Sequence, residues 1–222
     1  MPSFALVTEG ITDQVIIERI IYTIIEDALG EEPDINILQP LRDATDEARQ
    51  ATGSFGGWER VLEFCSSTEK LKEALEYNEF LVIQIDTDCC GHVNFDVPYH
   101  KDGIELTAEE LAGNVQSFIE AKLTPELMTQ YGHRIIFAIA VHSTECWLMP
   151  FYAALERDKR KEKSCATHLQ RALTKAKKNH EKTFRCYSDL SNCFNNLRDI
   201  NNSKSFSKTL EMFINSLTSK TL

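Results

Sequence analysis

The sequence lacks long hydrophobic runs. Of its 222 residues, 42% are hydrophobic and 26% are charged, which is ordinary for a globular protein. No apolar stretch approaches the roughly 20 residues of a membrane-spanning helix. Glu9 stands where a secretory signal peptide has its apolar core. We therefore expect a cytoplasmic protein with no membrane partner.

Paired cysteine motifs are also missing. The chain has seven cysteines, but none form a C-x-x-C pair of the kind that binds structural zinc. Cys89 and Cys90 are adjacent, so their side chains diverge from an extended backbone. We expect reduced, packed thiols rather than a zinc site or a disulfide framework.

Apolar segments alternate with helical patterns along the first two thirds of the chain. The segments expected to form buried strands are residues 4–7, 35–38, 80–85 and 135–141. Helical spacing separates them, with predicted N-caps at Thr12, Ser66 and Thr107 and a glycine-rich loop at 53–57. This order predicts an α/β fold with a parallel sheet of about four strands flanked by helices. We expect an α/β domain over residues 1–150 and a helical appendage over 151–222.

Acidic residues follow three of the four predicted strands. Glu9 follows the first, Asp86 and Asp88 follow the third, and Glu145 follows the fourth. The carboxyl ends of parallel strands share one edge of a sheet, so these carboxylates should converge there. Asp86 and Asp88, two residues apart on an extended segment, would point to the same side.

Clustered carboxylates favour a divalent cation, because like charges at close range resist ionisation. Their oxygen atoms suit Mg²⁺ or Mn²⁺ better than zinc or copper. The candidate ligands are Glu9, Asp13, Asp86, Asp88 and Glu145. Asp13 and Glu145 have a second interpretation, as acidic residues that stabilise the first turn of a helix.

Three segments that contain these acids resemble a known family. Thr8–Gln14 (TEGITDQ) resembles the glutamate-glycine turn of the Toprim domain, and Ile83–Gly91 (IQIDTDCCG) resembles its D-x-D segment. Glu145–Leu148 (ECWL) resembles a segment of small bacterial Toprim-like proteins related to nucleases of the overcoming-lysogenization-defect type. The resemblance covers residues 4–150.

The Toprim resemblance implies a Toprim-like catalytic domain over residues 1–150, with Glu9, Asp86 and Asp88 as its catalytic centre. The implied activity is Mg²⁺-dependent cleavage of phosphodiester bonds in DNA or RNA. The implied context is a toxic effector in phage defence that works beside a partner ATPase.

The acidic and basic residues are unevenly distributed. Residues 1–156 carry 9 Lys and Arg against 28 Asp and Glu, whereas residues 157–222 carry 15 against 6. The basic run from Arg157 to Arg185 is either a solvated helical face or a surface that contacts nucleic-acid phosphates. On the second interpretation, Lys175, Lys177 and Lys178 are the candidate nucleic-acid contacts.

A non-catalytic module is the alternative function. In that case Trp147 and the basic run would dock onto a partner such as an ATPase, whereas core packing is the simpler role for Trp58 and Trp147. His142 is either a packed histidine or a catalytic one. The composition leaves a homo-oligomer open.

Overall fold

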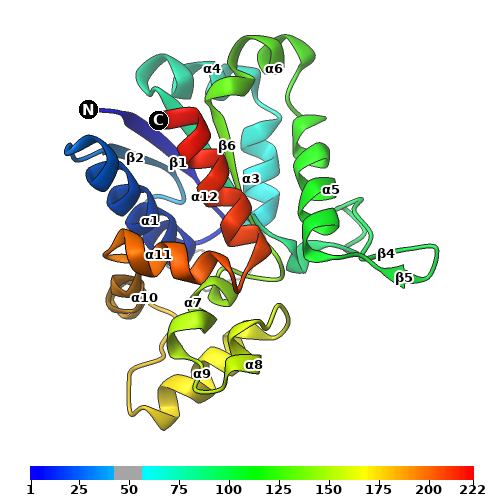
Figure 1. Ribbon diagram of the computed structural model, residues 1–222. Helices are drawn as coiled ribbons and strands as arrows, with labels where there is room; N and C mark the ends of the chain where they lie inside the picture. The colour runs from blue at the N-terminus through cyan, green and yellow to red at the C-terminus, as the bar shows by residue number, and fades with distance from the viewer. Residues whose placement is uncertain (43–56) are drawn as a thin grey trace.

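Four parallel strands form the central sheet. A computed structural model of the protein describes residues 1–42 and 57–222. The strands are β1 (Ser3–Val7), β2 (Asp34–Gln39), β3 (Phe80–Asp86) and β6 (Ile135–Ala140), in the order β2-β1-β3-β6. Every pairing between them is parallel, so their carboxyl ends share the lower edge of the sheet in Figure 1. The predicted α/β fold is confirmed, and each strand was predicted to within one residue at either end.

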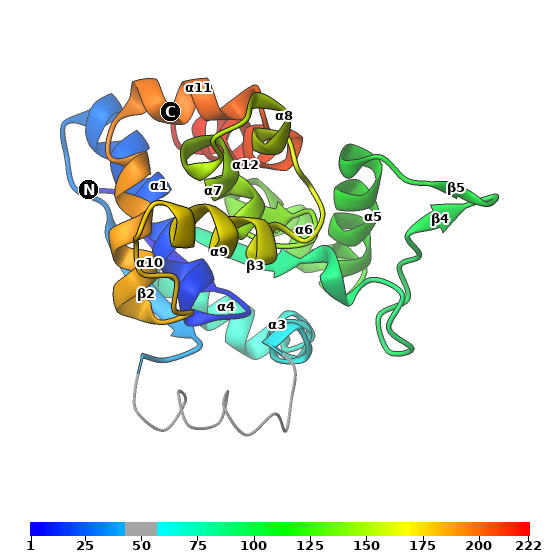
Figure 2. The ribbon, with the colours of Figure 1, turned by 90° about the horizontal axis from the view of Figure 1, so that it is seen from below.

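Helices cover both faces of this sheet. They are α1 (Ile11–Leu29), α3 (Gly57–Cys65), α4 (Thr68–Tyr77), α5 (Ala108–Glu120), α6 (Pro125–Tyr131), α7 (Glu145–Tyr152), α8 (Glu156–Lys159), α9 (Cys165–Lys175), α10 (Phe184–Ser191), α11 (Leu197–Lys204) and α12 (Lys208–Thr221). A hairpin of β4 (His100–Lys101) and β5 (Ile104–Glu105) projects from the body (Figures 1 and 2). Within the described residues, no helix combines the length and apolar character needed to cross a membrane.

The first core lies between the sheet and the helices that include α1 and α12. Alternate strand residues such as Phe4 and Val82 point into it, together with the isoleucines of α1. Residues beyond position 150 complete this core, among them Leu190, Phe213 and Leu217. The predicted boundary at residue 150 therefore does not separate two hydrophobic cores.

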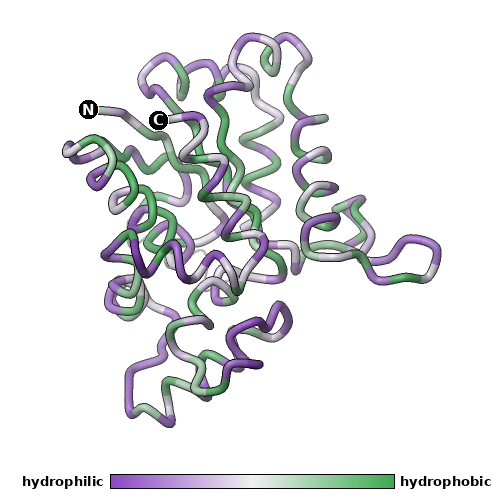
Figure 3. Tube along the Cα trace, viewed as in Figure 1, coloured by the Kyte–Doolittle hydropathy of each residue, from purple (hydrophilic) through white to green (hydrophobic). Residues whose placement is uncertain are grey.

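The second core lies on the opposite face of the sheet. It is built from the other set of alternate strand residues, such as Leu81 and Ile83, and from apolar residues of α3, α4, α5 and α6. The sheet is therefore buried on both faces, as its continuous apolar strands predict. In Figure 3 the strands are mostly hydrophobic, whereas the segment around α8 and α9 has long hydrophilic stretches.

Several local predictions are corrected by the backbone. Helix α1 begins at Ile11 with Gly10 as its N-cap, not Thr12, because the Gly10 carbonyl already accepts the Gln14 N–H. Ser67, not Ser66, caps α4 by accepting the N–H of Lys70. The Thr107 capping box of α5 is confirmed. The predicted glycine loop lies outside the described residues, apart from Gly57 at the start of α3.

The expectation of wholly reduced thiols is wrong. Cys146 of α7 and Cys165 of α9 form a disulfide. The two cysteines are 19 residues apart, and only the packing of α9 beneath α7 brings them together. Among the described residues, the other five cysteines are free.

Trp147 belongs to the core. It is completely buried, its ring stacks on Phe213, and its Nε1 donates a hydrogen bond to the Thr209 hydroxyl at 3.0 Å. The interpretation of Trp147 as a core residue is confirmed, and its alternative role in docking a partner is wrong because the ring is inaccessible. Trp58 is only partly buried and packs against the second core.

Candidate active site at the carboxyl edge

Five acidic residues come together at the carboxyl edge of the sheet. Glu9 follows β1, Asp13 lies in the first turn of α1, and Asp86 ends β3. Asp88 follows in a 3-10 turn, and Glu145 begins α7 just after β6. Burial raises the pKa of Asp86 well above its ordinary value, and the negative charges of Asp13, Glu9, Glu145 and Asp88 raise it further. The five carboxylates therefore repel one another when ionised.

A buried glutamine joins the ends of β1 and β3. Gln84 is completely buried in the middle of an otherwise apolar strand. Its Oε1 accepts the backbone N–H of Glu9 at 2.9 Å, and its Nε2 donates to Oδ1 of Asp86 at 2.8 Å. The Asp86 backbone N–H donates in turn to Oε1 of Glu9 at 2.7 Å. These three bonds fix the positions of Glu9 and Asp86 relative to each other.

Asp13 and Glu145 are held by partners from distant parts of the chain. The Thr144 hydroxyl donates to Oδ1 of Asp13 at 2.5 Å, and the Tyr187 hydroxyl of α10 donates to Oε1 of Glu145 at 2.6 Å. Glu145 is only 1% exposed, and its second oxygen, Oε2, has no hydrogen-bond partner. A buried carboxylate oxygen without a donor is costly and calls for an explanation. Asp13 and Glu145 thus do more than place charge in the first turn of a helix.

Burial and mutual repulsion disturb the ionisation of these groups. Burial is the main cause that raises the pKa of Glu9 well above its ordinary value, despite the hydrogen bond from Asp86. Burial, followed by the charge of Glu145, raises the pKa of Asp13 to about 6. Burial also raises the pKa of Asp88. Four of the five acids, all except Glu145, therefore hold protons more tightly than ordinary carboxylates do.

Lys182 brings positive charge to the cluster. Its Nζ lies 3.4 Å from Oε1 of Glu145, at the end of the loop between α9 and α10. Burial acts to raise the pKa of Glu145, but Lys182, the Tyr187 and Ser143 hydroxyls and the residue's own backbone N–H together outweigh it, and the pKa is lowered. The lysine side chain is 64% exposed, so solvent screens its charge. A single screened cation leaves the five carboxylates only partly neutralised.

The predicted relation between Asp86 and Asp88 is corrected. Residues Thr87–Cys89 form a 3-10 turn rather than an extended segment, so Asp86 is buried while Asp88 is exposed. The prediction that adjacent cysteines would diverge from an extended backbone fails for the same reason. The hydroxyl of Tyr99, which donates to the backbone oxygens of Thr87 and Asp88, holds this turn in place.

Two glycines allow close approach at the site. A Cβ atom on Gly10 would lie 2.8 Å from Oδ2 of Asp13, and one on Gly57 would collide with the carbonyl oxygen of Glu9. The first glycine keeps space beside a carboxylate oxygen of the cluster. The second lets the start of α3 pack directly on the backbone that carries Glu9.

A divalent cation fits the chemistry of this edge. The donor atoms are carboxylate oxygens, one of them is the unpartnered Oε2 of Glu145, and space lies beside Oδ2 of Asp13. As the side chains stand, no group of three or more His, Cys, Asp or Glu residues in the described part of the chain could hold a metal ion. Several of these oxygens instead accept hydrogen bonds from the protein. The magnesium site therefore stays a prediction.

His142 lies beside this edge with an unusual backbone. It follows β6 with a positive φ of 57°, which is uncommon for a residue other than glycine. Its N–H donates to the Thr87 hydroxyl at 2.8 Å, and its ring stacks on Tyr99. Partial burial lowers its pKa, followed by the charge of Lys163, while Asp88 opposes the shift. Packing accounts for His142, and its catalytic role stays a prediction.

The predicted lysine contacts lie on the α9 side of the edge. Lys175, Lys177 and Lys178 are all exposed at the end of α9 and just beyond it. The Lys178 ammonium lies 5.3 Å from the centre of the Tyr152 ring, so its charge already has a partner. Figure 2, viewed from below, shows α9 crossing in front of the strand ends. The basic run from Arg157 to Arg185, the basic segment from here on, therefore lies at the carboxyl edge of the sheet, where the carboxylates are.

Sequence reasoning missed Gln84, Lys182 and Tyr187. An amide inside a continuous apolar strand was a visible signal for Gln84, because a buried polar group needs partners. Lys182 lies in the basic run but nothing in that run distinguishes it from its neighbours. Tyr187 gave no signal, because its contact depends on how α10 packs.

Comparison with protein-family models, with curated proteins and with solved structures found no match to this chain.

Proposed function

We propose that the protein is a Mg²⁺-dependent nuclease that hydrolyses phosphodiester bonds in DNA or RNA. The observation that carries the proposal is the crowding of five carboxylates at the carboxyl edge, with the buried Oε2 of Glu145 lacking a partner. Such an arrangement costs stability unless a cation binds. The Toprim resemblance of the turn at Glu9 and of the segment at Asp86 and Asp88 supports the same activity.

The five acids would hold the metal, namely Glu9, Asp13, Asp86, Asp88 and Glu145. When bound, Mg²⁺ or Mn²⁺ acts as a Lewis acid on a phosphoryl oxygen and lowers the pKa of bound water. The hydrogen bonds of Gln84 hold Glu9 and Asp86 in fixed positions relative to each other. Glu9, Asp86 and Asp88 are the proposed catalytic residues.

The basic segment supports nucleic acid as the substrate. The first 156 residues have a large excess of acid and repel a polyanion, so approach requires positive charge from elsewhere. Helix α9 lies at the carboxyl edge (Figure 2), and the exposed Lys175 and Lys177, at its end and just beyond it, would supply this charge. Exposed lysines bind phosphates without sequence preference, which leaves both DNA and RNA as substrates.

The toxic role and the partner ATPase rest on the resemblance alone. A toxic role in phage defence, a partner ATPase, a cytoplasmic location and a homo-oligomer all remain predictions. In the competing proposal of a non-catalytic docking module, Trp147 cannot contact the partner, because its side chain is buried. A partner would have to use another surface.

A cleavage assay tests the proposal. The wild type should cut labelled DNA or RNA when Mg²⁺ is added, and chelation should stop the reaction. Glu9→Gln and Asp88→Asn should each lower the rate by at least about 100-fold, because a catalytic metal contributes several kcal/mol. Circular dichroism should show that both variants remain folded.

Glu126→Gln is the matched control for these variants. Glu126 is an exposed acid in α6, near the opposite edge of the sheet, and its removal should leave cleavage unchanged. Cleavage that survives in both Glu9→Gln and Asp88→Asn would rule out this site as the source of activity.

A further inference from the structure

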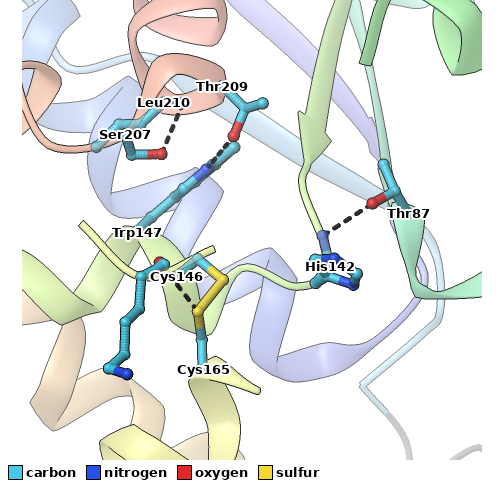
Figure 4. The surroundings of a disulfide bond; sticks show 9 residues. Thr87, His142, Cys146, Trp147, Cys165, Ser207, Thr209 and Leu210 are labelled. Carbon is cyan, nitrogen blue, oxygen red and sulfur yellow. Dashed lines mark hydrogen bonds between the residues drawn. A yellow bond between two sulfur atoms is a disulfide. The ribbon is translucent and has the colours of Figure 1, made fainter. Parts of the chain in front are cut away.

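The Cys146–Cys165 disulfide lies next to the carboxylate cluster. Cys146 directly follows Glu145 in α7, and Cys165 is the first residue of α9. Both cysteines are at most 3% exposed. Figure 4 shows the bond bridging the two helices, on the opposite side of α7 from Thr209. The bond thus joins the start of the basic helix to the helix that carries Glu145.

Apart from the disulfide, an ion pair between Lys163 and Glu105 of β5 holds the chain just before α9. Its N-cap, Ser164, has a left-handed backbone with φ 55° and makes no hydrogen bond from its side chain to the helix. Leu169 and Leu173 are buried, but they lie further along the helix, and most of the remaining side chains of α9 are exposed. The disulfide is therefore the covalent anchor of its first turn.

We propose that the Cys146–Cys165 disulfide is a redox-controlled clamp that fixes α9 against α7, and that its reduction releases the start of α9. In the reducing step, a dithiol gives two electrons and two protons to the bond. The protein is left with two thiols, and the dithiol becomes a disulfide. Glutathione disulfide reverses the step by thiol–disulfide exchange. A bond of this kind in a reducing compartment is typical of redox sensing.

The release should affect the two ends of the basic segment differently. Lys175 and Lys177 lie on or just beyond α9 and should lose their fixed position. Lys182 lies close to α10, where Tyr187 remains bonded to Glu145, so it should stay near the carboxylates. Reduction should therefore weaken nucleic-acid binding without changing the carboxylate cluster, a consequence that rests on the proposed function.

Hydrogen exchange measured by mass spectrometry tests the clamp without reference to activity. The full chain is compared after treatment with glutathione disulfide and after treatment with dithiothreitol. Amides of residues 165–175 should exchange at least about 10-fold faster in the reduced form, since closing a loop of this size stabilises it substantially. Cys165→Ser should exchange like the reduced wild type under both treatments.

Cys193→Ser is the matched control, because Cys193 is a free thiol outside the disulfide. This variant should keep the difference between oxidised and reduced forms. Equal protection of residues 165–175 in both forms of the wild type would overturn the clamp. So would titration of all seven cysteines as free thiols after oxidation. Loss of the proposed nuclease activity alone would leave the exchange result unaffected.

Discussion

At the amino edge of the sheet cations bind backbone carbonyls, whereas at the carboxyl edge carboxylates face one another. Arg134 precedes β6 and donates to the carbonyl oxygens of Glu79 at 2.7 Å and of Asn78 at 2.6 Å. Lys220, near the end of α12, donates to the carbonyl oxygens of Gly132 and Ile135. These charges complete hydrogen bonds that the fold requires.

The carboxyl edge is only partly balanced, by Lys182 beside Glu145. The pKa of Glu9 and that of Asp86 are raised by burial and by neighbouring charge, and Oε2 of Glu145 has no donor. Natural proteins keep such unfavourable groups at sites where function requires them. Charge at the amino edge therefore stabilises the fold, whereas the ionised carboxylates Glu9 and Asp86 at the carboxyl edge destabilise it.

The largest effect should come from breaking the amino edge. Arg134→Met should lower the free energy of unfolding by about 3 kcal/mol, because it leaves the partly buried carbonyl oxygens of Leu75 and Asn78 without their charged donor. Urea unfolding measures the change. Arg198→Met, at an exposed position in α11, is the control and should change little. Equal losses in the two variants would show that Arg134 has no special role.

At the carboxyl edge the free energy of unfolding should fall as pH rises, whereas the acid of an ordinary salt bridge loses its contribution as pH falls. The pKa of Asp13 is about 6 in the fold against an ordinary value of 3.8, so the folded state binds the proton more tightly. Protonated Asp13 therefore contributes up to about 3 kcal/mol to the free energy of unfolding. This contribution is fully present below the pKa of the unfolded state and is lost as pH rises through about 6.

Asp13→Asn should therefore raise the stability of the metal-free chain at pH 8 and flatten this part of its pH profile. The amide oxygen of asparagine can still accept the hydrogen bond from Thr144. Thermal unfolding from pH 4 to 8 with chelator present measures both effects. A variant with the same pH profile as the wild type would show that Asp13 is not a strained acid.

Addition of Mg²⁺ should stabilise the wild type more than a variant that lacks one of the carboxylates. A cation that binds only the folded state adds about 2.7 kcal/mol at 100 times its Kd. The wild type should gain this stability on addition of Mg²⁺, and Asp86→Asn should gain much less. Glu126→Gln should match the wild type. Equal gains in all three proteins would locate the ion elsewhere.

The sequence predicted the sheet well because its strands are continuous apolar runs buried on both faces. It also placed Glu9, Asp86 and Glu145 at one edge, since strand order alone dictates that. The interactions that depend on packing were out of reach: the Tyr187 contact with Glu145 and the pairing of Cys146 with Cys165. These join segments that no local pattern connects.

The smallest expected effect concerns the lysines of the basic segment. Replacing Lys175, Lys177 and Lys178 with glutamate should weaken binding to DNA and RNA alike. Each lost phosphate contact should reduce the slope of log K against log salt by about 0.7 to 0.9. Fluorescence anisotropy across a salt series measures this slope, and the Mg²⁺-dependent thermal shift should be unchanged.

Single variants separate the contributions of the individual lysines to the salt slope. Lys178→Met should change the salt slope less than Lys177→Met, because the Lys178 ammonium already lies over the Tyr152 ring. Lys72→Met is the control, because Lys72 lies in α4, which packs on the second core and away from α9. If the triple variant leaves the slope unchanged, the positive charge that offsets the carboxylates during substrate approach must come from a partner or a second copy of the chain.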